Sequence, residues 1–314
     1  MIKLFKNIKN FQLVIIAVLG IGIGSSILFF SNDFSFKRFF LEDNKNVIKE
    51  VIKENMVPLS NINKIDVDSD SADVNIVSEE RKDIKVKFEK AKDSKKANYN
   101  LNVAVNNNSL DIKASNNKKL LNIISLGDTE KVTITIYLPK NYNKNLNVDT
   151  SLGSIDLKDI KLDNVICELG LGSMNITNVQ AENFKCNNKN GKIIANKLYT
   201  NSTTINASLG KAILKEFTGA LEMDMGNGSA DISYVKLNNN VNIKQSLGDV
   251  DISLPKNAEF YLDADTKLGD LQCDFPVTIQ GNVKDEGKLE GVVKADKYKV
   301  IIKNSNGDIN IKQR

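Results

Sequence analysis

The chain has 314 residues and a formal net charge of +4, and it contains neither histidine nor tryptophan. Without histidine, the commonest general base and zinc ligand is missing, which excludes Ser-His-Asp and Cys-His catalytic arrangements. Of the 43 basic residues only Arg38, Arg81 and Arg314 are arginine, and no basic–aromatic motif accompanies the lysines, so nucleic-acid binding is not expected. We therefore predict a protein that is not an enzyme and that holds no cofactor and no metal ion.

The first apolar segment, Phe11–Phe30, predicts a single transmembrane signal-anchor. Its twenty residues include one strongly polar side chain, Gln12, and as a helix they would span about 30 Å, the thickness of a bilayer core. Three lysines in residues 1–10 favour a cytoplasmic tail, which places the remainder of the chain outside the cell membrane. The alternative is a cleaved signal peptide, with the small residues Gly22, Gly24 and Ser26 near the cut.

Residues 31–59 follow as a predicted juxtamembrane stalk. Apolar side chains recur at helical spacing in its second half, and Pro58 would end such a helix. This pattern predicts a short amphipathic helix carrying Val47, Ile48, Val51, Ile52 and Met56.

An irregular β region is predicted over 60–145, where alternation continues without a fixed period. We expect this region to cap the first regular coil, because an open solenoid end is an aggregation-prone edge. The segment 139–145 is interpreted as an inserted loop. The strands predicted here are Lys64–Val67, Ala72–Val77, Ile84–Phe88, Tyr99–Val105, Leu110–Lys113 and Lys131–Leu138.

Regular repeats occupy 146–314, where glycines recur at intervals of 19, 19, 19, 18, 20, 21 and 38 residues. A fixed period of this length predicts a solenoid whose units bury their apolar sides by stacking on one another. Each glycine is expected to open a strand at a corner that needs positive φ. The corner glycines are Gly153, Gly172, Gly191, Gly210, Gly228, Gly248, Gly269 and Gly307.

Alternation after each glycine, and again about eight residues later, predicts two strands per coil. Corresponding strands of successive coils would pair in parallel about 4.8 Å apart and form two facing sheets. A further apolar residue is expected to close the far corner, at Ile160, Val179, Leu198, Phe217 and Val235. The second strands are expected to bury Val165, Cys167, Leu169, Phe184, Cys186, Ile205, Ala207, Leu221, Met223, Met225, Val241, Ile243, Phe260, Leu262 and Ala264.

The three cysteines do not predict a disulfide framework. Cys167 and Cys186 are 19 residues apart, and so occupy the same inward position on adjacent coils. Stacked strands would bring their Cα atoms within disulfide range, yet parallel side chains make good torsion angles hard to reach. We interpret these two as reduced, buried apolar residues, and place Cys273 in a first strand near the end of the stack.

The acidic run Asp66, Asp68, Asp70 and Asp73 does not predict a calcium site. It resembles the start of an EF-hand loop, but Ser71 stands where that loop needs glycine and no glutamate follows at the twelfth position. Aspartates that alternate along the solvent-exposed face of a strand explain the pattern.

The Ser-Leu-Gly units such as 151–153, the Asn-Gly-Asp-Ile-Asn-Ile unit at 306–311 and the Ile-Tyr-Leu-Pro-Lys segment at 136–140 carry a family resemblance. With the N-terminal anchor, they resemble the bacterial "putative adhesin" domain of unknown function, related to toast-rack β-solenoids, over about residues 60–314. The resemblance implies a membrane-tethered, extracytoplasmic solenoid, often linked with Gram-positive envelopes. It brings no catalytic residues.

Two functions follow as hypotheses. The first is a non-enzymatic, adhesin-like binding or scaffold module at the cell envelope, with a cell-wall polymer or another envelope protein as partner. Lys192 and Lys211, just after two corner glycines, are the residues assigned to polymer binding. The alternative is a component of an envelope-stress sensing or signalling complex that acts through a membrane protein partner.

Overall fold

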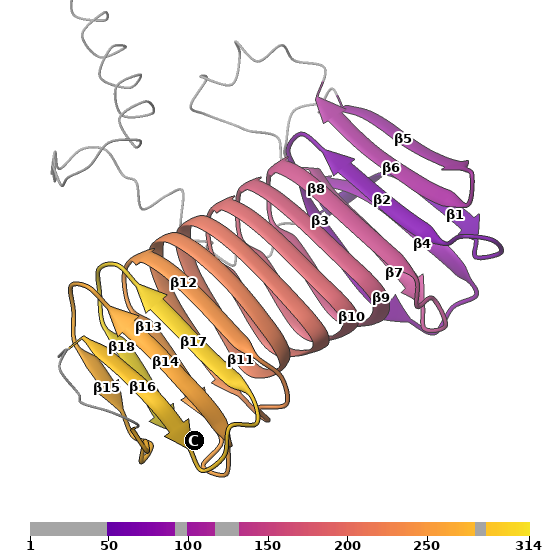
Figure 1. Cartoon of the computed structure of the whole chain (residues 1–314). Coiled ribbons are helices and arrows are strands. Elements are labelled where there is room, and N and C mark those ends of the chain that lie inside the picture. Colours follow the sequence, from indigo (N-terminus) through magenta and orange to yellow (C-terminus); the bar gives the residue numbers. More distant parts are fainter. Residues whose placement is uncertain (1–48, 92–98, 117–131, 280–286) are drawn as a thin grey trace, which may run out of the picture. The chain divides into compact units, whose positions relative to one another are not determined.

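The computed structural model describes residues 49–91, 99–116, 132–279 and 287–314, all within one compact unit, Val47–Arg314. These residues form 18 β-strands stacked as coils (Figure 1). The all-β class predicted from the alternation is therefore confirmed. None of the described ranges contains a helix able to cross a membrane. The predicted tail 1–10, the predicted anchor Phe11–Phe30 and the stalk residues 31–48 lie outside them.

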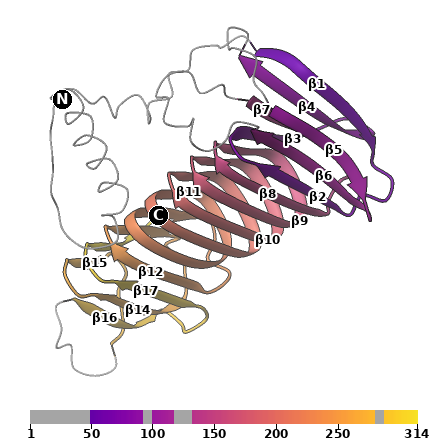
Figure 2. The ribbon, with the colours of Figure 1, turned by 90° about the horizontal axis from the view of Figure 1, so that it is seen from above.

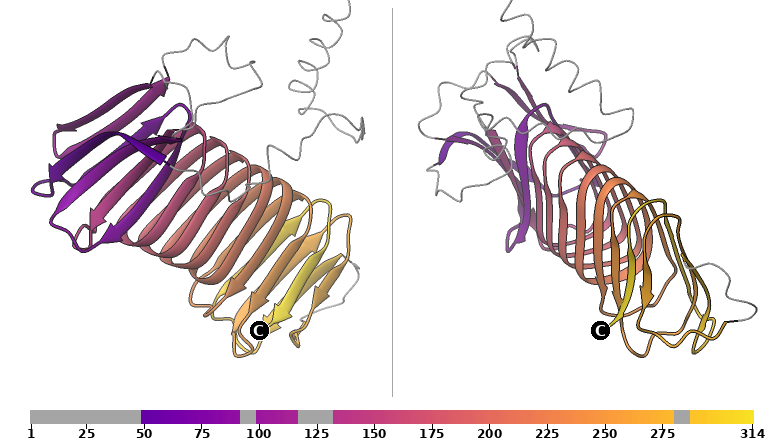
Figure 3. Two further views of the ribbon diagram at one scale, coloured as in Figure 1. Left: turned by 180° about the vertical axis from the view of Figure 1, so that it is seen from behind. Right: turned by 90° about the vertical axis from the view of Figure 1, so that its left-hand side faces the viewer.

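The stack has two walls, which face each other across the core (Figure 3). The first wall contains the segments that follow the corner glycines. In spatial order its members are β1 (Lys49–Pro58), β4 (Asp83–Ala91), β7 (Val132–Pro139), β3 (Ala72–Glu79), the first parts of β9 (Ile155–Leu171) and β10 (Met174–Asn190), portions of β11 (Ile193–Tyr234), then β13 (Val250–Leu254), β18 (Ile309–Gln313) and β15 (Leu271–Cys273).

The second wall contains the segments that lead toward the next glycine, and Figure 2 shows its strands from above. Pairing is parallel throughout both walls except for β1–β4, β4–β7, β5–β6 and β14–β16. In spatial order the second wall has β5 (Tyr99–Asn106), β6 (Ser109–Asn116), β2 (Lys64–Ser69), β8 (Asn145–Leu152), the later parts of β9 and β10, portions of β11, then β12 (Val241–Leu247), β17 (Lys299–Asn304), β14 (Phe260–Thr266) and β16 (Lys288–Val293).

The core is the column of inward side chains between the walls. Every side chain predicted to point inward from the second strands is at most 7% exposed, from Val165 in the first regular coil to Ala264 near the other end. Removing this apolar area from water is the main term that stabilises a stack whose coils could not fold singly. The two-residue alternation thus predicted correctly which side chains of the second strands point into the core.

The prediction of two separate strands per coil needs a correction in the central coils. There β9 and β10 each run for 17 residues, because the ladder continues around the far corner, and β11 runs for 42 residues, because its ladder also continues through the corners at Gly210 and Gly228. The chain turns at non-glycine residues of positive φ: Asp159 (53°), Asn178 (53°), Lys197 (62°) and Glu216 (51°). The pairing of β9, β10 and β11 skips Asp159, Asn178 and Lys197 and resumes at the next residue, so each strand is assigned as continuous through the corner.

The order of the coils also differs from a simple succession. The last coil in sequence, β17 and β18, lies between the coil of β12 and β13 and the coil of β14 and β15 (Figure 1). At the other end, β2 and β3 lie between β6–β7 and β8–β9. The interval of 38 residues between Gly269 and Gly307 therefore precedes a coil that is inserted between two earlier ones. The insertion gives the terminal segment a neighbour on both sides, which protects it from an open edge.

The predicted stalk helix is wrong for its described part, because Lys49–Pro58 is strand β1. It pairs antiparallel with β4, with Met56 opposite Lys85 and Val57 opposite Ile84. An isolated helix of this length is marginal in water, whereas the edge of β4 offers a full row of backbone partners. Val51, Ile52 and Met56 consequently stay 46%, 42% and 52% exposed instead of forming a buried stripe.

Two smaller predictions are also corrected. Residues 140–144 form a coil corner and not an inserted loop: Tyr142 is 4% exposed and its hydroxyl donates to the Asn145 carbonyl at 2.7 Å. At the far corner of a later coil Val235 is 46% exposed, and Tyr234 is buried in its place against Phe217, with ring centroids 4.9 Å apart. The larger ring reaches the core one residue earlier in the chain.

The remaining strands predicted over 60–145 are present as β2, β3, β4, β5, β6 and β7. They belong to the same compact unit as the regular coils.

Candidate functional site

The glycine corner is built by close approach of successive backbones. The eight corner glycines have φ between +122° and +156°, a region that side-chain-bearing residues rarely adopt. A Cβ on Gly191 would lie 1.7 Å from the Gly172 carbonyl oxygen, and one on Gly210 would lie 1.7 Å from that of Gly191. The glycines therefore have a structural role at this corner, as the sequence predicts.

Buried polar side chains support the same corner from inside. They occupy the last inward position before a glycine and donate to the carbonyl of a corner glycine, which satisfies groups that the turn leaves unpaired. The sequence did not predict these hydrogen bonds, because the polar residues that form them interrupt an otherwise apolar column. The bonds are Asn188 Nδ2 to Gly172 O (3.4 Å), Gln245 Nε2 to Gly228 O (3.0 Å), Asn304 Nδ2 to Gly248 O (2.8 Å) and Thr266 Oγ1 to Gly307 O (2.8 Å).

Lys192 and Lys211 lie next to each other on the outer side of this corner. Each directly follows a glycine of the ladder, and both side chains are exposed. Neither forms an ion pair with any residue of the described ranges. The two ammonium groups thus form a small basic patch, open to an anionic ligand.

The positions directly after the corner glycines form a row across the coils. Toward the yellow end of Figure 1 this row becomes acidic, because Asp249, Asp308 and Asp270 follow the glycines there. Their carboxylates bridge coils: Asp249 Oδ1 accepts from the Asp308 backbone N–H at 2.9 Å, and Asp308 Oδ1 accepts from that of Asp270 at 2.9 Å. A continuous basic strip is therefore not present along the row, and the patch is confined to the two lysines.

Outer-face amides form hydrogen-bonded rows that cross the coils. Asn164 Nδ2 donates to Asn145 Oδ1 at 2.7 Å, and Asn183 Nδ2 donates to Asn164 Oδ1 at 2.8 Å. A second row links Asn206, Asn187 and Glu168 by the same 19-residue step. One side chain per coil thus repeats along the surface, a regular pattern of donors and acceptors.

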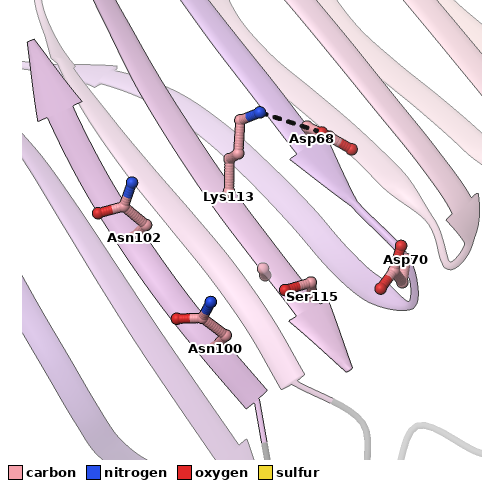
Figure 4. Close-up of a pocket in the computed structure, with 7 residues that line it drawn as sticks. Asp68, Asp70, Asn100, Asn102, Lys113 and Ser115 are labelled. Atoms are coloured by element: carbon pink, nitrogen blue, oxygen red, sulfur yellow. Dashed lines mark ion pairs between the residues drawn. The ribbon is translucent and has the colours of Figure 1, made fainter. Parts of the chain in front are cut away.

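A shallow pocket of about 230 Å³ lies over β2, β6 and β5. Its polar lining includes Asp68, Asp70, Asn100, Asn102 and Lys113 (Figure 4). The Lys113 ammonium lies 3.7 Å from the Asp68 carboxylate, with the two side chains 59% and 63% exposed. A pair this exposed is screened by water and contributes little to stability or binding.

The other acids of the Asp66–Asp73 run have partners of their own. Asp66 pairs with Lys64 at 2.8 Å, and Asp73 accepts from the Ser154 backbone N–H at 2.9 Å. Within the described ranges no group of three or more cysteine, aspartate or glutamate side chains is placed to hold a metal ion.

Cys167 and Cys186 lie side by side, in register on adjacent parallel strands, and both are free thiols with no exposed surface. Burial raises the pKa of the Cys167 thiol well above its usual value and that of Cys186 to about 12. A protonated, inaccessible thiol is a poor nucleophile. These two cysteines therefore act as apolar core residues, as predicted, and Cys273 lies half-buried in β15.

The family model named Toastrack DUF4097 matches residues 62–312, which is most of the chain and nearly all of its described part. The chain belongs to this family. The assignment agrees with the resemblance carried by the glycine repeats. A search of curated proteins finds no match to the Toastrack chain.

Several solved structures are similar to this Toastrack protein. A "putative cell adhesion protein" from Clostridium sporogenes ATCC 15579 is 18% identical, covers 85% of this chain and 100% of its own, and has a TM-score of 0.27. A "putative adhesin" from Bacteroides fragilis NCTC 9343 is 13% identical, with coverages of 84% and 97% and a TM-score of 0.36. One from Parabacteroides merdae ATCC 43184 is 12% identical, with the same coverages and TM-score.

Proposed function

We propose that this Toastrack chain is a non-enzymatic, adhesin-like binding module of the cell envelope. Its domain would be displayed outside the membrane on the single anchor Phe11–Phe30. The observation that carries the proposal is the repetition of outward-facing polar side chains from coil to coil, such as the half-buried Asn145 and Asn164 and the exposed Asn183. A regular surface of this kind matches a repetitive polymer better than a single small molecule, because each coil adds one weak and equivalent contact.

The basic patch of Lys192 and Lys211 supplies the charge that an anionic wall polymer would need. Both ammonium groups are exposed and belong to adjacent coils, so one polymer segment can reach both. Attraction between exposed charges is screened by salt, and attachment should therefore weaken as the ionic strength rises.

Replacing both lysines by glutamate should weaken binding of the purified chain to an anionic cell-wall preparation by about tenfold at low salt. The measurement is a sedimentation assay over a range of salt concentrations. The control is Lys185→Glu with Lys189→Glu on the outer face of β10, which makes the same change in net charge elsewhere. Salt-independent attachment, or equal weakening by both double variants, would count against the patch. Recovery of one membrane protein and no wall material would instead favour the signalling function.

A further inference from the structure

A second hollow, of about 330 Å³, lies at the corner opposite the glycines. It crosses adjacent coils between two outward rows of side chains. One row consists of Lys161, Gln180 and Tyr199, and the other of Asp163, Glu182 and Asn201. Register places each row across β9, β10 and β11, so the hollow is a groove that runs along the stack.

Small floor residues create the groove. Between the two rows lie Leu162, Ala181 and Thr200, which are 3%, 8% and 8% exposed. The floor side chains of the second and third coils, alanine and threonine, are smaller than the leucine of the first. The next coil has Gly219 at the equivalent position, where an added Cβ would lie 2.4 Å from Thr200 Oγ1. The floor is therefore low while both rims stand out from it.

The lining offers both donors and acceptors at short intervals. Amide side chains on Gln180, Asn201 and Asn238 can each donate and accept. The Glu182 carboxylate already accepts from Asn201, and it and the Asp163 carboxylate can each accept more than one bond. Asn238 Oδ1 is buried and has no hydrogen-bond partner in the described structure. A buried acceptor left without a partner costs free energy, which a ligand hydroxyl could recover.

Charge and backbone pairing narrow the ligand class. The lining holds one lysine and two carboxylates, and Lys144 beside it lies 3.6 Å from Asp163, so the groove has no excess of positive charge to attract a polyanion. The backbone beneath the groove is paired from coil to coil, as in Gln180 with Lys161 and Tyr199, so an added peptide strand finds no open edge here. The half-buried Tyr199 belongs to the lining, and a tyrosine side chain combines an apolar ring with a polar hydroxyl, which suits the mixed surface of a sugar ring.

We infer that this groove binds a neutral, hydroxyl-rich glycan whose chain lies along the stack, with its sugar rings spaced over successive coils. The inference rests on the proposed function, because it names a ligand class for the binding module. The glycan site is separate from the basic patch at Lys192 and Lys211, so one wall could be held through its sugar chains and through its anionic polymer.

The test applies the full chain, purified in mild detergent, to a printed array of neutral and anionic bacterial oligosaccharides and peptide-bearing wall fragments. Neutral oligosaccharides should bind, and Tyr199→Ala should weaken the best of them by about tenfold. Tyr199→Phe keeps the ring and should retain affinity within about twofold. Tyr137→Ala, on the outer face of β7 away from the groove, is the matched control and should leave binding unchanged.

Binding of anionic or peptide-bearing probes alone, no binding at all, or equal affinity of the Tyr199→Ala variant would overturn the glycan site. Thermal melting of each variant separates lost binding from lost folding. If the chain attaches to whole cell wall but the Tyr199→Ala variant binds the neutral oligosaccharides as well as the original does, the groove assignment fails while the binding function stands. If the unmodified chain does not attach to wall at all, the proposed function itself fails.

Discussion

Replacing Gly191 by alanine should lower the free energy of unfolding by about 3 kcal/mol or more, or prevent folding. Two effects combine at this corner. The φ of +143° belongs to a region open almost only to glycine, and the new Cβ would lie 1.7 Å from the Gly172 carbonyl oxygen. The obstacle is backbone, shared with the ladder on both sides, so neither coil can move without disturbing its neighbour. Urea denaturation of the purified chain measures the effect.

The control is Lys192→Ala, one residue further along, where the side chain is exposed. A surface truncation of this kind should change stability by no more than about 0.5 kcal/mol. Similar stabilities for the Gly191→Ala and Lys192→Ala variants would mean that the glycine ladder does not pack as closely as described.

The second large effect is expected for Ile243→Asp. Ile243 is 0% exposed and lies in the inward column between Met223 and Ile302 of the neighbouring coils. A carboxylate there would lose its hydration and find only apolar neighbours, which should cost several kcal/mol and prevent cooperative folding near neutral pH. The measurement is the melting temperature of the purified chain, followed by circular dichroism.

Asp251→Asn is the matched surface change. Asp251 is 38% exposed at its side chain and pairs with Lys312 at 2.7 Å. Because an exposed pair contributes only about 0–1 kcal/mol, its loss should be small. Equal melting shifts for Ile243→Asp and Asp251→Asn would show that the inward and outward assignments are wrong.

Period and alternation in the sequence predicted most of the fold. Residues such as Ile243 alternate with polar neighbours, so the two-residue period of a strand directly predicts which side chains face the core. The corner glycines were predicted from their recurrence at intervals near 19 residues and from the positive φ that such a corner needs. These are local rules, repeated in each coil, and repetition makes them easy to recognise.

The order of the coils could not be predicted this way. Gly307 packs against Gly248 and Gly269, yet the chain reaches it only after the coil of Gly269 is complete. Every coil presents nearly the same edge, so sequence pattern alone does not say which edge a later coil joins. Similarly, β1 forms because β4 offers it an edge, a tertiary partner that overrides the helical spacing of Val51 and Met56.

The groove was missed because its signal is spread over the repeats. Lys161, Gln180 and Tyr199 recur at 19-residue spacing, as do Asp163, Glu182 and Asn201, but each looks like an ordinary surface residue within its own coil. Aligning the coils on their glycines would have placed them in two rows. The shrinking floor between the rows becomes visible only when the packing is known.

The central claim, a Toastrack domain displayed outside the cell on a retained anchor, is tested most directly by washing cell membranes with high salt and carbonate. Mass spectrometry then defines the N-terminus of the chain that remains. The intact chain should stay with the membranes, since the twenty mostly apolar residues of Phe11–Phe30 would hold it independently of charge. Recovery of a soluble chain that begins near Ser25 or Ser26 would contradict the retained anchor and indicate a cleaved signal peptide.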